Sequence, residues 1–439
     1  MQYKVEDLAP LKKKFEVTVP AADIDKHIDL MAAKYRASVS VPGFRKGKAP
    51  LKMIEAQYHK DIYSEATSEM IDGNVRRIID ELELDPASKV EYDAEVVARG
   101  KDFTYSFSFE VMPVFDLPDY QGFPVEEEEV VVGDDEIDNM LQMARRDLAD
   151  MAPVSEKRAP RDGDVATVDM TAFDEEGKEI PSLTVSGLDL ALGEKLTFEA
   201  FEDFVKSVTV GEEAEKQITF PADFMNSEFA GKEVRMKVKV SALNERQLPE
   251  LNDEFAAKLG PFATMDAVRD AIRTSFTQSR ANVTRSVAQN KLLEGLLGKI
   301  DFPLPETLVQ RFTAVAQANH FDRLRQQAGK GDKPQDIGKL EDFRDQAVEE
   351  AKKHVKEYVF LYRVAKAEKI EVSEQEILQF IAQSAASARR SFEEVRDEYV
   401  NNNMIGVVHE RIMSDKALKH LYSKAEVTMV KPAAKPEEK

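Results

Sequence analysis

The most specific stretch of this 439-residue sequence is Gly43-Phe44-Arg45-Lys46-Gly47-Lys48-Ala49-Pro50. Its glycines and proline, with Pro42 just before them, predict a tight and exposed loop. An aromatic ring and three cations lie between them, so the tip can combine apolar contact with pairing to phosphate or carboxylate groups. Composition alone favours a solvated basic turn.

The segments on either side of this loop indicate a small domain of mixed structure. Residues that alternate between apolar and polar predict strands, and apolar residues at helical spacing predict helices. These patterns cover residues 15–19, 24–35, 51–84, 90–96 and 103–111. We therefore expect an α+β domain over residues 1–112.

The rest of the chain divides by composition into four further segments. Residues 113–150 are proline-containing and carry two Arg against twelve Asp and Glu, which predicts an acidic linker with a short helix. Residues 151–245 alternate like strands between Gly turns and predict a compact antiparallel β-rich domain. Residues 246–430 predict an all-α body, with a capping box at Ser373-Glu374-Gln375-Glu376, and residues 431–439 a disordered tail. The fold class is thus multidomain α+β.

Bulk composition excludes several kinds of function. The net charge of −21 argues against a protein that coats nucleic acid, although residues 1–50 carry ten Lys and Arg against six Asp and Glu. There is no cysteine for disulfide or thiolate chemistry, and the six histidines form no metal-ligand pair. No N-terminal apolar segment and no apolar run of about 18 residues occurs, so we expect a soluble, cytoplasmic protein.

The loop motif resembles the one that docks bacterial trigger factors on the ribosome, Gly-Phe-Arg-x-Gly-Lys-x-Pro, at all six fixed positions. The resemblance extends over essentially the whole chain. It implies that the tip docks beside the peptide exit tunnel of the large subunit through Phe44, Arg45 and Lys46. The ribosome-binding residues it implies are Gly43, Phe44, Arg45, Lys46, Gly47, Lys48 and Pro50.

The middle segment resembles the FKBP-type prolyl isomerases found inside trigger factors. The similarity runs from Asp162-Gly163-Asp164 through Leu192-Gly193 and Phe201-Glu202-Asp203 to Phe220-Pro221. Rotation about an X–Pro bond requires no nucleophile, metal or base, because a dry apolar pocket can favour the twisted amide. The candidate pocket residues are Met170, Ile180, Leu190, Phe198, Phe201, Phe224 and Met236. Apolar residues at these places would serve a β-domain core equally well.

Four departures from the FKBP pattern predict reduced isomerase activity. Met170 stands where family members usually have an aromatic residue, and Pro181 where they have an acidic one. Glu199-Ala200 replaces a Pro-Gly pair, and Phe224 lacks the hydroxyl of a tyrosine that is often found there.

The resemblance implies a ribosome-associated chaperone that keeps nascent chains in a folding- or export-competent state. Its partners would be the large ribosomal subunit near the exit tunnel and nascent or unfolded polypeptides, with no cofactor, metal, membrane or free nucleic acid. It leaves open a homodimer away from the ribosome. The alternative is a plain FKBP-type isomerase recruited to particular folded partners without ribosome docking. An export chaperone of the cell envelope is disfavoured because no signal peptide is seen.

Overall fold

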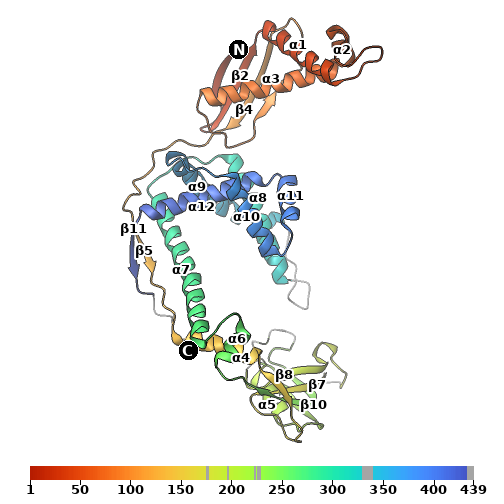
Figure 1. Cartoon of the computed structure of the whole chain (residues 1–439), viewed down its shortest axis with the longest axis vertical. Helices are drawn as coiled ribbons and strands as arrows, with labels where there is room; N and C mark the ends of the chain where they lie inside the picture. The colour runs from red at the N-terminus through yellow and green to blue at the C-terminus, as the bar shows by residue number, and fades with distance from the viewer. Residues whose placement is uncertain (175–176, 195–196, 222–223, 225–228, 329–339, 433–439) are drawn as a thin grey trace. The chain divides into compact units, whose positions relative to one another are not determined.

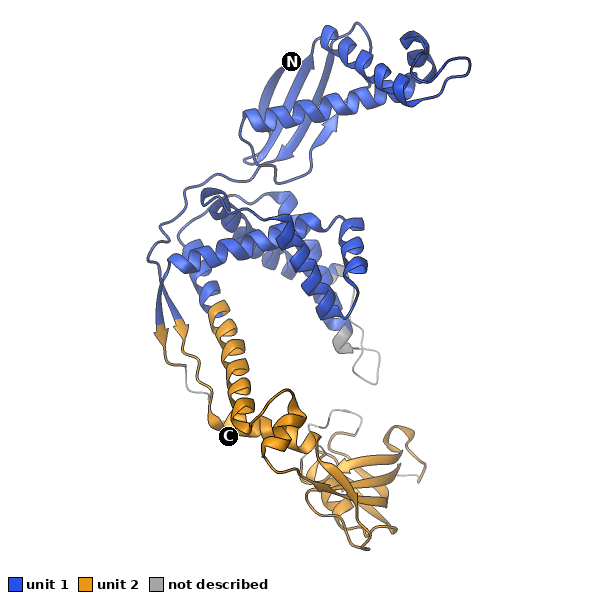
Figure 2. Ribbon diagram, in the orientation of Figure 1, with its two compact units in different colours: residues 1–126, 287–327, 336–428 blue, residues 127–286, 328–335, 429–439 orange. Residues whose placement is uncertain are grey.

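The computed structural model describes residues 1–174, 177–194, 197–221, 224, 229–328 and 340–432. Its described parts form two compact units (Figure 2). The first unit comprises residues 1–126, 287–327 and 336–428, and the second comprises residues 127–286, 328–335 and 429–439. The multidomain α+β class is confirmed, whereas the domain boundaries remain a prediction. Within the described ranges no helix is long and apolar enough to cross a membrane.

The N-terminal part of the first unit is a four-stranded antiparallel sheet with helices over one face (Figure 1). The strand order is β1-β2-β4-β3. Phe15 lies opposite Phe107 in the β2–β4 register, and their stacked rings are 4.8 Å apart at the centre of the core. The elements are β1 (Gln2–Asp7), β2 (Lys12–Val19), α1 (Ala21–Ser38), α2 (Leu51–Gln57), α3 (His59–Glu81), β3 (Glu91–Asp93) and β4 (Phe103–Glu110).

This part differs from expectation in three places. Strand β1 was not foreseen, and the helical run from residue 51 is two helices, because Tyr58 leaves helical geometry with φ −114° and ψ 29°. The strand expected over residues 90–96 is only β3. The backbone N–H of buried Val97 donates to the Thr67 hydroxyl on α3 at 3.1 Å, so the chain leaves the sheet there to pack on that helix.

Most of the helical part of the first unit packs around one apolar core, and residues 374–401 enclose a smaller cluster around Ile381 and Val395. Leu292, Leu296, Val359, Phe360 and Leu421 are all buried in the larger core. Pro303 and Pro305 separate two long helices, as the sequence predicts. The helical elements are α7 (Met265–Leu297), which begins in the second unit, α8 (Glu306–Ala328), η2 (Leu340–Phe343), α9 (Arg344–Ala367), α10 (Glu374–Ala388), α11 (Phe392–Asn401) and α12 (Ile405–Lys424).

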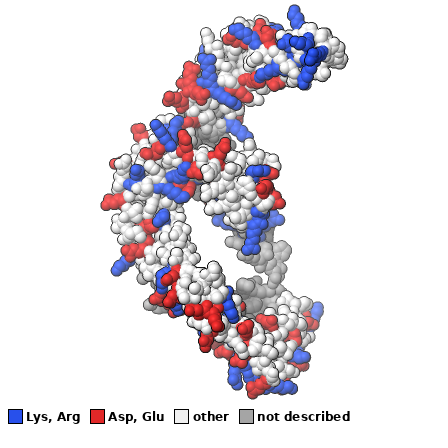
Figure 3. Space-filling view, in the orientation of Figure 1, with Lys and Arg blue, Asp and Glu red and all other residues white. Residues whose placement is uncertain are grey.

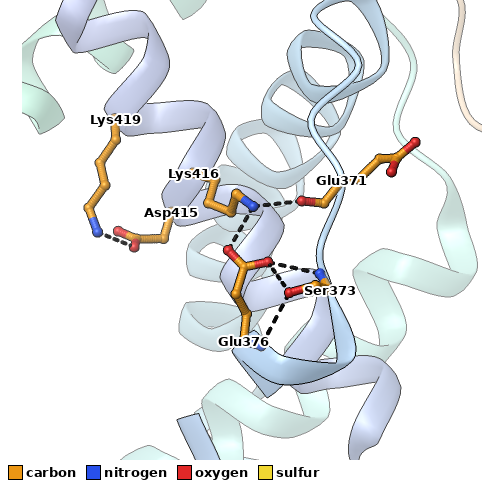
Figure 4. Close-up of polar contacts among 6 residues, drawn as sticks. All are labelled: Glu371, Ser373, Glu376, Asp415, Lys416 and Lys419. Carbon is orange, nitrogen blue, oxygen red and sulfur yellow. Dashed lines mark hydrogen bonds and ion pairs between the residues drawn. The ribbon is translucent and has the colours of Figure 1, made fainter. Parts of the chain in front are cut away.

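The predicted capping box at the start of α10 is confirmed (Figure 4). The Ser373 hydroxyl accepts from the Glu376 N–H at 3.3 Å, and the Glu376 carboxylate accepts from the Ser373 N–H at 2.8 Å. Lys416 on α12 donates to the same carboxylate at 2.7 Å. These bonds lower the pKa of the Glu376 carboxyl to about 2, and the bond from Lys416 is the largest cause.

A two-stranded sheet occupies a part of the chain that was expected to be linker and helix. β5 (Pro124–Glu128) pairs with β11 (Glu426–Val430) near the C-terminus. Backbone bonds of 3.0 Å from Glu426 to Phe123 and 2.8 Å from Glu129 to Val430 hold the pair. Val125 is buried in the apolar core, and buried and exposed residues alternate along β5. The acidic side chains hide this strand pattern in the sequence.

The second unit is built on an antiparallel sheet in the order β6-β10-β7-β8, with β9 also paired to β10. The long strand β10 alternates as far as Val240, where a bulge shifts its register, and it buries Val234, Met236, Val238 and Val240 in the same cluster as residues of α5. The strands and the short helices between them are β6 (Asp150–Pro153), β7 (Asp164–Phe173), η1 (Pro181–Leu183), β8 (Val185–Ala191), α5 (Glu199–Lys206), β9 (Glu213–Thr219) and β10 (Glu233–Gln247). Helices α4 (Asp134–Asp147) and α6 (Asp253–Leu259) pack with the start of α7 around Ile137 and Leu141.

Candidate functional site

The loop between α1 and α2 is formed by two consecutive tight turns. The N–H of Phe44 donates to the carbonyl of Val41 at 3.1 Å, and the N–H of Lys48 donates to that of Arg45 at 2.9 Å. The third position of each turn is a glycine with positive φ, +87° at Gly43 and +79° at Gly47. A turn with positive φ at that position favours glycine, because it has no Cβ to clash.

The ends of this loop are fixed while its tip is free. Val41 and Ala49 are buried in the N-terminal core, and Pro50 precedes the first residue of α2. Phe44 is 39% exposed, unusual for a phenylalanine, and Arg45, Lys46 and Lys48 are exposed. None of these three cations forms an ion pair with a residue that the structure describes. Lys and Arg side chains gather over α1, α2 and the loop in the space-filling view (Figure 3).

The second candidate site is an apolar pocket of about 550 Å³ in the second unit. It opens between the sheet, the start of α5 and the segment that follows β9. None of the lining side chains that the structure describes ionises. They are Met170, Leu183, Leu188, Thr197, Phe198, Phe201, Phe220, Pro221, Phe224 and Met236.

Phe198 contacts the three other phenylalanines that line this pocket. Its ring centroid lies 4.9 Å from that of Phe220, 5.8 Å from that of Phe201 and 5.9 Å from that of Phe224. Phe201 and Phe220 are buried, whereas Phe198 and Phe224 are half-buried and present ring surface to the opening. Offset and edge contacts of this kind hold aromatic rings in defined orientations.

A buried carboxylate fixes the chain just before Phe198. Glu202 accepts a hydrogen bond from the N–H of Gly193, and Lys206 lies 3.9 Å from the same carboxylate. Gly193 has a φ of +83°, and a Cβ there would come within 2.9 Å of Asp162. One hydrogen bond therefore joins the Leu192-Gly193 motif to the Phe201-Glu202-Asp203 motif, and Phe201 belongs to the pocket wall.

The structure brings together five of the seven residues proposed from sequence for this pocket. Met170, Phe198, Phe201, Phe224 and Met236 line it. Leu190 lies in the β-domain core and Ile180 packs at the edge of that core, so neither lines the pocket. Sequence reasoning missed further lining residues, although Phe220-Pro221 had been noted as a motif. They are Leu183, Leu188, Thr197, Phe220 and Pro221. The part of any of these residues in catalysis remains a prediction.

No group of three or more His, Asp or Glu side chains in the described ranges could hold a metal ion.

Comparison with known families gives three matches along the chain. Residues 1–144 match the bacterial trigger factor protein family, residues 156–241 the FKBP-type peptidyl-prolyl cis-trans isomerase family, and residues 264–423 the C-terminus of the bacterial trigger factor protein.

Curated relatives match over nearly the full length. The trigger factor of Nitratidesulfovibrio vulgaris (strain DP4) is 42% identical over 99% of both chains, and that of Oleidesulfovibrio alaskensis is 38% identical over 99% of this chain and 98% of its own. The Geobacter sulfurreducens trigger factor is 30% identical over 94% and 97%. A solved structure from work on promiscuous substrate recognition by the trigger factor chaperone aligns over 96% of this chain and 99% of its own, with 17% identity and a TM-score of 0.49.

Proposed function

Since the chain belongs to the bacterial trigger factor family, we propose that it is a cytoplasmic chaperone that docks on the large ribosomal subunit beside the exit tunnel. There it holds nascent and unfolded polypeptides in a folding- or export-competent state. The observation that carries the proposal is the loop tip of Phe44, Arg45 and Lys46. It is exposed, its two cations form no ion pair with a described residue, and it matches the family's docking motif.

The physical basis of docking is a small patch that combines two kinds of contact. The Phe44 ring can fill an apolar depression, and Arg45 and Lys46 can pair with phosphate or carboxylate groups. Because the two turns fix the backbone in advance, little conformational freedom is lost when the tip binds. The ionic part of the affinity should weaken with added salt, since exposed charges are screened.

The test is ribosome binding by the triple variant Phe44→Ala/Arg45→Ala/Lys46→Ala. We expect its affinity for purified ribosomes at moderate salt to fall by more than about tenfold. The melting temperature should not change, because the three removed side chains contribute little to the core. The double variant Arg76→Ala/Arg77→Ala is a charge control, since it also removes exposed cations from the N-terminal domain. Co-sedimentation of the triple variant at the wild-type level would favour the alternative of a plain isomerase.

We further propose that residues 151–245 form a prolyl isomerase domain of reduced activity. The barrier to rotation about an X–Pro bond is about 18–20 kcal/mol and comes from amide resonance. The twisted amide has lost this resonance and carries less charge on its oxygen, so an apolar pocket favours it over the planar amide. Support comes from the match to the FKBP family and from the aromatic cluster around Phe198. In this proposal Phe198, Phe201, Phe224, Met170 and Met236 contact the proline.

A further inference from the structure

An ion-pair cluster in the N-terminal domain joins the helices that flank the docking loop. The Arg99 guanidinium donates from Nε to Glu55 Oε1 at 2.8 Å and from Nη2 to Glu55 Oε2 at 3.0 Å. The same Nη2 donates to Asp29 at 2.5 Å. Asp29 lies on α1, which precedes the loop, and Glu55 lies on α2, which follows it. One side chain therefore bridges the two helices between which the loop is suspended.

The backbone around Arg99 is held firmly enough for it to act as a fixed point. The N–H of Gly100 donates to Asp25 on α1 at 3.0 Å, and Val97 is bonded to Thr67 on α3. Tyr63 on α3 donates to Glu55 Oε1 at 2.6 Å, which gives that carboxylate a third anchor. The hydrogen bond from Arg99, first among several causes, holds the pKa of Glu55 below its ordinary value, as expected for a two-pronged ion pair.

Helix α2 has little else to hold it in place. It has only seven residues, far fewer than the roughly 12–15 that an isolated helix needs. No side chain caps its N-terminus, and Ile54 is its only buried residue. Leu51 is only partly buried against the N-terminal core, and Glu55 is next to Ile54, so the Arg99 contact fixes the helix beside its one fully buried side chain.

We propose that Arg99 is a positioning residue for ribosome docking, which holds α2 against α1 and thereby keeps the loop of residues 43–50 in its binding conformation. This inference rests on the proposed ribosome-docking function. Arg99 itself need not touch the ribosome. An exposed or half-exposed ion pair contributes little to global stability. Its loss should therefore appear in loop order and ribosome affinity before it appears in melting.

The experiment compares Arg99→Met with Lys34→Met in the full chain. Lys34 pairs with Glu69 at 2.8 Å and links α1 to α3 but not to α2, so the control removes one positive charge and one ion pair from the same domain. We expect Arg99→Met to bind purified ribosomes about five- to tenfold more weakly, because the loop must then be ordered on binding. Lys34→Met should stay within about twofold of wild type. Amide exchange over residues 43–57 should be faster in Arg99→Met than in the wild type, and it should be unchanged in Lys34→Met.

Two further variants approach the cluster independently. Glu55→Gln keeps the size of the side chain and removes the charge, and it should reproduce the faster exchange and weaker binding. Arg99→Lys keeps the charge but loses the planar fork, so its affinity should be intermediate. Wild-type affinity and wild-type exchange in Arg99→Met would overturn the inference. If wild-type protein fails to bind ribosomes, the proposed docking function fails instead, and the exchange data alone decide whether Arg99 orders the loop.

Discussion

Phe201 and Phe204 offer a matched pair of residues for separating catalysis from stability. Both are buried on α5, but only Phe201 lines the apolar pocket. Truncating either ring to alanine should destabilise the domain by about 3–5 kcal/mol, because it leaves a cavity in a packed core. Phe201→Ala should also reduce isomerase activity per folded molecule on a prolyl peptide, whereas Phe204→Ala should not. Melting curves and kinetics must be measured on the same samples. Equal losses per folded molecule would remove Phe201 from the pocket's function.

The same assay should show almost no dependence on pH between about 6 and 8. None of the lining side chains that the structure describes ionises, so we expect no proton transfer to limit the rate in this range. A bell-shaped profile centred near neutrality would contradict this and would show that an acid or base takes part. Undetectable activity in the folded wild-type domain would mean that its departures at Met170, Pro181, Glu199-Ala200 and Phe224 leave a proline-binding or spacer module.

At the scale of single elements, the capping box of α10 should make this helix sensitive to acid. The pKa of Glu376 is lowered from 4.5 to about 2 in the folded state, so its stabilising contribution is complete above about pH 4.5. It should be lost as the pH falls from 4.5 towards 2, because the carboxylate must then be protonated. Amide protection over residues 374–388, measured relative to the intrinsic exchange rate at each pH, should fall in step with that protonation. Protection that stays constant until the whole protein unfolds would contradict this.

Ser373→Ala tests the other half of the capping box. Removing an N-cap hydroxyl should cost about 1 kcal/mol, since a helix N–H loses its partner. Ser387→Ala on the last turn of the same helix is the control, because that hydroxyl only bonds back to the carbonyl of Gln383. It should change stability by less than about 0.5 kcal/mol. Equal effects of the two substitutions would show that the cap contributes nothing specific.

Elements with strong local signals could be predicted from the sequence, and those defined by distant partners could not. The capping box of α10, the alternation in β10 and the loop motif each carry their signal within a few residues. Strands β5 and β11 have only five residues each and pair across some 300 positions, so neither segment alone predicts the other. Leu183 and Leu188 reach the pocket through the path of the chain after β7, which periodicity does not reveal.

At the scale of the whole molecule, the β-rich domain should be dispensable for holding clients. Asp150 pairs directly with Gln247 between β6 and β10, so the two ends of the domain lie about 5 Å apart. Residues 150–247 can therefore be replaced by two glycines. None of the other hydrophobic clusters includes a described residue of this segment. The shortened chain should suppress aggregation of an unfolded test protein, followed by light scattering, nearly as well as the intact chain. Loss of protection by a folded deletion variant would place client binding in the removed domain.

The pairing of β5 with β11 bears on how the protein itself is made. The core of its helical part is assembled from Met112 and Val125, from residues 288–308, and from segments as late as Leu421. A ribosome that adds about 5–20 residues per second must work for many seconds between the first and last of these. Early segments of that core must therefore wait, uncovered, until the chain has been translated at least as far as Leu421. A newly made copy is thus for a time an unfinished chain with exposed apolar surface, the very kind of client that finished copies are proposed to hold.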